Sequence, residues 1–148
     1  MKPLIVLLSV FGLCIGITVL LGNMDIDFSG RIAMSAMLAF TAMGHFKFTD
    51  GMAMMLPAFI PAKKQIVLAT GVIEVLAATG LLVSSTIHIT GILLIVFFVL
   101  VLPANIYAAI KKVDLEKANH TGNGINYLWF RIPEQLFFIA WVYFFAIK

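Results

Sequence analysis

Glu74 is a carboxylate near the middle of the apolar stretch 65–83, and it is the residue from which the chemistry of this chain can be argued. An acid at the centre of a lipid-spanning helix costs about 3 kcal/mol or more, so it normally faces protein or water and has a partner. The side of the helix that carries Glu74 also carries small residues, namely Thr70, Gly71, Ala77 and Ala78. Because small residues let another helix approach closely, we expect Glu74 to point into a bundle.

Polar side chains on other apolar stretches are candidate partners for this acid. They are His45, Asn105, Arg131, Glu134 and Gln135, which all fall in the inner half of the bundle if the N-terminus is cytoplasmic. The last three share one helical face at spacings of three and four residues. Arg131 is the natural counter-ion for Glu74 or Glu134, because a guanidinium can bridge two carboxylates.

These candidates also have structural interpretations. Arg131 with Glu134 can act as a polar link that fixes helix register. Asn105 can cap the backbone carbonyl that the proline two residues before it leaves free, and a lone His45 near the end of a span can be an ordinary interfacial residue. For Glu74 a functional role is favoured, since a midplane acid is costly to keep for packing alone.

The sequence contains no motif of a soluble catalytic centre: no P-loop, nucleotide fingerprint, nucleophile elbow, HExxH or cysteine pair occurs. Cys14 is the single cysteine, which excludes an intrachain disulfide and a cysteine-based metal site. The methionines lack partner cysteines or a regular spacing and so do not favour Cu(I) binding. We therefore expect no metal and no covalently bound cofactor.

The composition indicates that much of this chain lies in lipid. Of its 148 residues 62% are hydrophobic and 11% are charged, and the apolar residues gather in runs near 20 residues long. This pattern is typical of an integral membrane protein whose partner is the lipid bilayer. The net charge of +3 comes from residues scattered in short loops without a basic stripe, so nucleic acid is not an expected partner.

The sequence predicts one all-α domain, a polytopic membrane helical bundle with five spans. The predicted spans are about 4–21, 31–48, 65–83, 87–110 and 127–147. The first run is longer than a signal-peptide core and lacks a small-x-small cleavage site, so we interpret it as a retained span. A polar turn at 22–30 joins the first two spans.

Three connecting features complete the predicted bundle. The Met-rich and Pro-rich segment 49–64 is too short to span and predicts a re-entrant or interfacial elbow. The hydroxyls at 84–86 can cap the following helix, and Pro103 cannot bond the Val99 carbonyl, which predicts a kink. The polar segment 111–126 predicts a flexible cytoplasmic loop.

The positive residues set the expected orientation. With a cytoplasmic N-terminus, eight Lys and Arg residues fall inside, at positions 2, 47, 63, 64, 111, 112, 117 and 131. Arg31 and Lys148 fall outside. The positive-inside rule therefore predicts a multi-pass membrane protein with a cytoplasmic N-terminus and its C-terminus outside.

From about residue 30 onward the chain resembles the DoxX family of small bacterial membrane proteins. The matching pieces, in order, are Gly44-His45-Phe46 with Asp50 and the elbow to Pro61, residues 70–74 with 80–82, residues 103–107, and residues 131–135. The resemblance implies a four-helix core to which this chain adds an N-terminal helix. His45, Glu74, Asn105, Arg131 and Gln135 occupy polar positions of that family, whereas Glu134 stands where its usual form is apolar.

The resemblance also implies quinone-linked redox work, since DoxX proteins are described as subunits of thiosulfate:quinone oxidoreductase or of a terminal quinol oxidase. We therefore expect an intramembrane polar pocket for a small amphipathic molecule, such as a quinone or phenol, in a redox-associated accessory subunit. Any catalysis would be that of a quinone-linked oxidoreductase subunit with a membrane or redox partner protein, and a homo-oligomer is compatible. The alternatives are a structural or chaperone-like subunit without a ligand and a proton-coupled small-molecule transporter.

Overall fold

The computed structural model describes residues 2–22 and 25–148, and within them the chain is helical, as predicted. The elements are α1 (Lys2–Leu20), α2 (Ile26–Lys47), α3 (Thr49–Ala53), α4 (Lys63–Gly80), α5 (Ile87–Ile110), the 3-10 helix η1 (Gly124–Tyr127), α6 (Leu128–Val142) and the π-helical turn η2 (Tyr143–Ile147). The described residues form no strand beyond one isolated bridge between Asp114 and Asn119.

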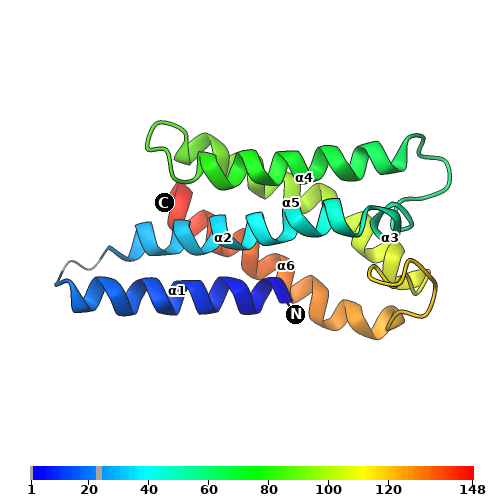
Figure 1. Cartoon of the computed structure of the whole chain (residues 1–148), viewed down its shortest axis with the longest axis horizontal. Helices are drawn as coiled ribbons and strands as arrows, with labels where there is room; N and C mark the ends of the chain where they lie inside the picture. The colour runs from blue at the N-terminus through cyan, green and yellow to red at the C-terminus, as the bar shows by residue number, and fades with distance from the viewer. Residues whose placement is uncertain (1, 23–24) are drawn as a thin grey trace.

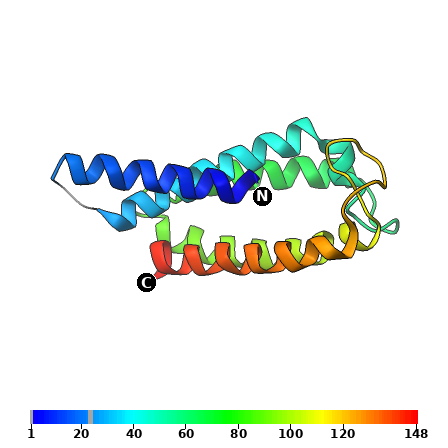
Figure 2. The ribbon, with the colours of Figure 1, turned by 90° about the horizontal axis from the view of Figure 1, so that it is seen from below.

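The long helices lie in two layers (Figures 1 and 2). One layer holds α1, α2 and α4, with α2 between the other two, and the second layer holds α5 and α6. Successive long helices run in opposite directions, so the N-terminal end of α1 and the C-terminal end of η2 point to opposite ends of the bundle (Figure 1). This alternation is the arrangement that short connections between apolar helices favour.

The core between the layers is built on the face of α2 that carries Ala33, Met34, Met37 and Leu38, all at most 1% exposed. These positions recur at spacings of three and four residues, which is one face of a helix. At one end of this face Gly30 lies against the second layer. Its carbonyl accepts a hydrogen bond from Trp141 Nε1 at 3.0 Å, and a Cβ at Gly30 would lie 2.4 Å from the Phe145 ring.

Helix α2 begins at Ile26, five residues before the predicted start of the second span. Asp25 is its N-cap, and the carboxylate accepts a hydrogen bond from the Phe28 amide at 2.8 Å. Asp27 lies in the first turn, where a negative charge is stabilising. Residues 25–30 of the predicted polar turn therefore form the start of a helix. Residues 23 and 24 of that turn lie outside the described residues.

The turn between α4 and α5 differs from the prediction in what its hydroxyl does. Thr86 is the N-cap of α5, but its side chain makes no cap hydrogen bond to that helix. Its hydroxyl instead donates to the carbonyls of Gly80 at 2.9 Å and Val83 at 3.1 Å. The threonine therefore satisfies carbonyls left at the end of the preceding helix, which also need partners.

The segment 49–64 consists of α3, irregular backbone and the first two residues of α4, and its α3 packs on the loop 111–126. Ala62 adopts a left-handed conformation with φ 52° directly before α4. Lys63 Nζ donates to the Leu56 carbonyl at 2.9 Å, and Lys64 Nζ pairs with Asp50 at 2.7 Å. Gly51 approaches the loop so closely that a Cβ there would lie 2.0 Å from the Leu115 carbonyl oxygen.

Within the described ranges, three helices are long and apolar enough to cross a membrane: α1, α5 and the continuous helix Gly124–Ile147. They identify an integral membrane protein. Helices α2 and α4 are not among these three, and they carry several of the polar residues of the chain, including His45 and Glu74.

The close approach at Gly51 predicts that Gly51→Ala destabilises the fold by about 1–3 kcal/mol, because the methyl group meets backbone and not a flexible side chain. Unfolding of the detergent-solubilised protein measures the effect. Gly12→Ala is the matched control, since a Cβ at Gly12 meets nothing within 4 Å. Equal stability of the two variants would contradict the packing described for Gly51.

Candidate functional site

Glu74 lies on the buried face of α4, together with Val67, Gly71 and Ala78. Only 6% of the residue is exposed, so it points into the bundle, as its small neighbours predict. Gly71 is the reason that α2 can come so near: a Cβ at this position would lie 2.9 Å from the Cβ of His45. The glycine therefore sets the distance at which the two helices present their polar side chains to each other.

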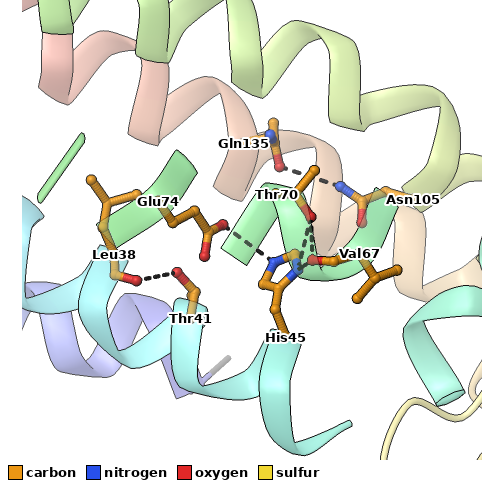
Figure 3. A network of polar contacts seen from close by, with 8 residues as sticks. All are labelled: Leu38, Thr41, His45, Val67, Thr70, Glu74, Asn105 and Gln135. Carbon is orange, nitrogen blue, oxygen red and sulfur yellow. Dashed lines mark hydrogen bonds and ion pairs between the residues drawn. The ribbon is translucent and has the colours of Figure 1, made fainter. Parts of the chain in front are cut away.

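The basic group that faces Glu74 is His45, near the C-terminal end of α2 (Figure 3). Its Nε2 lies 3.4 Å from Glu74 Oε1, and the two side chains are 17% and 8% exposed. Among the described residues Glu74 forms no ion pair with Arg131, which was the predicted counter-ion. Arg131 Nη1 instead pairs with Glu134 Oε2 at 2.9 Å, three residues along its own helix.

The second ring nitrogen of His45 contacts two groups of α4. Nδ1 is 3.1 Å from the Val67 carbonyl oxygen and 3.0 Å from Thr70 Oγ1. The Thr70 hydroxyl can donate to the same carbonyl at 2.8 Å, which leaves its oxygen free to accept. Because a backbone carbonyl only accepts, a hydrogen bond to Val67 requires a hydrogen on Nδ1; in the other neutral tautomer the Thr70 hydroxyl donates to Nδ1 and the hydrogen lies on Nε2.

Each tautomer gives the pair a different contact. With the hydrogen on Nε2, the neutral ring donates to Glu74 Oε1, 3.4 Å away. With the hydrogen on Nδ1, a hydrogen bond between Nε2 and Oε1 requires a second proton, on the ring or on the carboxyl group. In this second form the Glu74–His45 pair has no net charge.

The other carboxyl oxygen of Glu74 is buried without a hydrogen-bond partner among the described residues. A buried carboxyl oxygen left unpaired costs free energy comparable to a lost hydrogen bond, or more if it is charged. Such a group in a native structure is a candidate contact for a ligand or water. The pair can therefore accept a hydrogen bond at this oxygen, or donate one when the carboxyl group carries the proton.

The remaining predicted site residues form a second group, on α5 and α6. Asn105 Nδ2 donates to Gln135 Oε1 at 3.5 Å, and Gln135 Nε2 donates to the Phe98 carbonyl at 2.9 Å. The structural interpretation of Asn105 predicts a cap on the Val99 carbonyl. Among the described residues Asn105 forms no hydrogen bond to that carbonyl and instead contacts Gln135. Gln135 reaches α5 at the residue before Val99, and the amide pair links the two helices of the second layer.

The six predicted residues therefore lie in two groups, one in each layer. Figure 3 labels Glu74 and His45 of the first group and Asn105 and Gln135 of the second. Among the described residues no hydrogen bond or ion pair joins Glu74 or His45 to Asn105, Gln135 or Arg131. Thr70, which the sequence analysis gives only as a small neighbour of Glu74, contacts the His45 ring. A signal for its place was present, because Thr70 and Glu74 are four residues apart and therefore share one face of α4.

Two open hollows lie elsewhere on the molecule, and neither is lined by Glu74 or His45. One, of about 540 Å³, adjoins the end of η2 and the start of α2; the other, of about 360 Å³, lies between residues 46–51 and the loop 111–126. Among the described residues, no three His, Cys, Asp or Glu side chains gather in a way that could hold a metal ion.

Residues 34–146 match the model of a family described as a domain of unknown function, DUF8561. The matched region contains both polar groups and begins within α2, so α1 lies outside it. No curated protein and no solved structure matches the chain.

The hydrogen-bond geometry predicts that His45 carries a proton on Nδ1 in the folded protein. ¹⁵N NMR of the histidine-labelled chain in detergent detects that proton by its one-bond coupling. His88→Gln and His120→Gln variants assign the His45 signal. A neutral ring that is protonated only at Nε2 would contradict the predicted hydrogen bond from Nδ1 to the Val67 carbonyl.

Proposed function

The chain belongs to the DUF8561 family, and we propose that it is a multi-pass membrane protein that binds a small amphipathic molecule at the Glu74–His45 pair. The observation that carries the proposal is the burial of a carboxyl group with one oxygen on an imidazole and the other without a hydrogen-bond partner among the described residues. An acid kept in this state near the middle of an apolar helix is a functional-site hypothesis by default.

The chemistry of the pair selects the class of ligand. When the shared proton lies on the imidazole, Glu74 Oε2 is a carboxylate oxygen that accepts a hydrogen bond from a hydroxyl group. When it lies on the carboxyl group, the acid can donate to a carbonyl oxygen. A hydroquinone or phenol offers the hydroxyl and a quinone offers the carbonyl, on a ring that suits apolar surroundings. The DoxX resemblance supports the same class.

The pair would also give a bound quinol a place for its proton. His45 lies near the end of α2, close to the elbow, so the imidazole stands between the buried carboxyl group and that end of the bundle. Positioned acid–base groups within hydrogen-bond reach are what proton transfer requires. We therefore propose an accessory subunit for quinone-linked redox chemistry, in which a partner protein or the quinone itself carries the electrons.

The proposed topology has five spans, a cytoplasmic N-terminus and an external C-terminus. The ion pair of Lys2 with Glu116 supports it by bringing the start of α1 to the loop 111–126. At the opposite end, Arg31 Nη1 donates to the Phe145 carbonyl at 3.3 Å, three residues before Lys148. Lys2 thus lies near the basic residues of the loop 111–126, and Arg31 lies near Lys148, which is the grouping that the positive-inside rule gives for the proposed topology.

A second candidate function is that of a structural subunit without a ligand. It is favoured by the contacts of His45 Nδ1, which join α2 to the Val67 carbonyl and the Thr70 hydroxyl of α4. Polar contacts of this kind fix the register of neighbouring membrane helices. Under this alternative, loss of the Glu74 charge changes stability but no binding event.

The first proposal predicts that hydroquinone binds the purified protein and that Glu74→Gln weakens this binding at least about tenfold, because one charged or proton-sharing contact is lost. Isothermal titration of the full chain in detergent measures both affinities. Glu116→Gln is the matched control, since this acid is exposed in the loop 111–126. Unfolding of Glu74→Gln, measured in parallel, separates a binding defect from a loss of structure.

Two results would contradict the ligand proposal. One is the absence of hydroquinone and benzoquinone binding to the unchanged protein, and the other is equal affinity of a folded Glu74→Gln variant. The structural alternative would gain support if that variant lost stability while no ligand bound to either protein.

A further inference from the structure

The hollow of about 540 Å³ lies at the end of the bundle where α2 begins and η2 ends. Its lining includes Asp27 of α2 and, from α6 to the end of the chain, Phe137, Trp141, Phe144, Phe145 and Lys148. This hollow shares no lining residue with the Glu74–His45 pair. Aromatic side chains at the end of a membrane helix are typical of the level at which lipid headgroups meet the acyl chains.

Opposite charges meet at this hollow without neutralising each other. Asp27 and Lys148 line it, and among the described residues neither forms an ion pair. The ammonium group of Lys148 lies over the Phe144 ring, 5.4 Å from its centre. The hollow therefore presents one anionic and one cationic group at the same rim.

Arg31 adds an under-satisfied cation to the same region. It follows Asp27 by one helical turn, and its Nη1 donates to the carbonyl of Phe145, which lines the hollow. Its Nε is buried and has no hydrogen-bond partner among the described residues. A guanidinium presents five donors and pairs most strongly with carboxylate or phosphate oxygens. Among the described residues the Arg31 guanidinium forms no ion pair with a carboxylate.

The shape of the lining fits a ligand with a polar head and an apolar tail. Phe137, Trp141, Phe144 and Lys148 recur at spacings of three and four residues, so they form one stripe along the C-terminal helix. At the rise of a helix this stripe is roughly 15 Å long. It is charged at its end and aromatic along its length towards the middle of the bundle.

We propose that this hollow is a binding site for the headgroup of a zwitterionic phospholipid, phosphatidylethanolamine in the first place. The phosphate contacts Lys148 and the guanidinium of Arg31, and the ammonium contacts Asp27 and the aromatic faces. One acyl chain lies along the aromatic stripe. Asp27 disfavours a lipid whose headgroup carries only negative charge, because like charges repel.

Native mass spectrometry of the full chain in detergent tests the site with two lipids, dioleoyl phosphatidylethanolamine and dioleoyl phosphatidylglycerol. We expect the unchanged protein to prefer the ethanolamine lipid roughly fivefold, as one additional charge contact at an exposed site allows. Asp27→Asn is expected to abolish that preference, and Lys148→Gln to weaken both lipids. Asp25 remains as the N-cap of α2 in the first variant, so the helix keeps its start.

Matched charge changes at the opposite end of the bundle serve as controls. Glu116→Gln and Lys117→Gln lie in the loop 111–126, far from the hollow in sequence and at the other end of the fold, and we expect both to retain the preference (Figure 1). Preference for phosphatidylglycerol that Asp27→Asn leaves unchanged would overturn the proposal in favour of a simple anion site. Equal retention of both lipids by all variants would overturn it in favour of non-specific annular lipid.

Discussion

A carboxyl group inside an apolar helix bundle must hold a proton or face a positive charge, and the Glu74–His45 pair meets this requirement. The contact depends on the backbone as much as on the two side chains. Gly71 lets α2 approach α4, and the Val67 carbonyl and the Thr70 hydroxyl hold the imidazole through Nδ1. This orientation directs Nε2 at Glu74 Oε1.

The two layers of the fold solve the problem of buried polar groups in different ways. In the first layer an acid and an imidazole contact each other through one carboxyl oxygen, which leaves the other oxygen available for another molecule. In the second layer the side-chain amides link α5 to α6. Asn105 donates to Gln135, and Gln135 donates to the Phe98 carbonyl. The first arrangement is suited to binding and the second to holding helices together.

Helix α1 has a different relation to the site from the other helices. The family match begins at Met34, so the region that the family shares contains both polar groups without α1. This helix packs on α2, and Leu7 is its fully buried side chain. Its Phe11 ring lies edge-on to the Trp141 ring, with 4.9 Å between the ring centres. It contributes no residue to the Glu74–His45 pair, and its outer face is apolar, as expected of a helix in contact with lipid.

Much of the fold could be predicted from the sequence, because apolar runs bounded by polar turns define helices directly. The range of α5 and the inward face of Glu74 follow from composition and helical spacing. The partner of Glu74 did not follow, because spacing fixes which face a residue occupies but not which residue the neighbouring helix presents. Arg131 has an acid three residues away on its own helix, and this local contact takes precedence over a distant one.

A double-mutant cycle of Glu74→Gln and His45→Gln, measured as unfolding free energies of the full chain in detergent, tests whether the two side chains interact in the folded protein. If they do, their effects are coupled by at least about 1 kcal/mol, because either change alone leaves the other group buried without its partner. Free energies that add to within about 0.5 kcal/mol would show that the two residues do not interact, and would contradict the Glu74–His45 pair as the centre of the site.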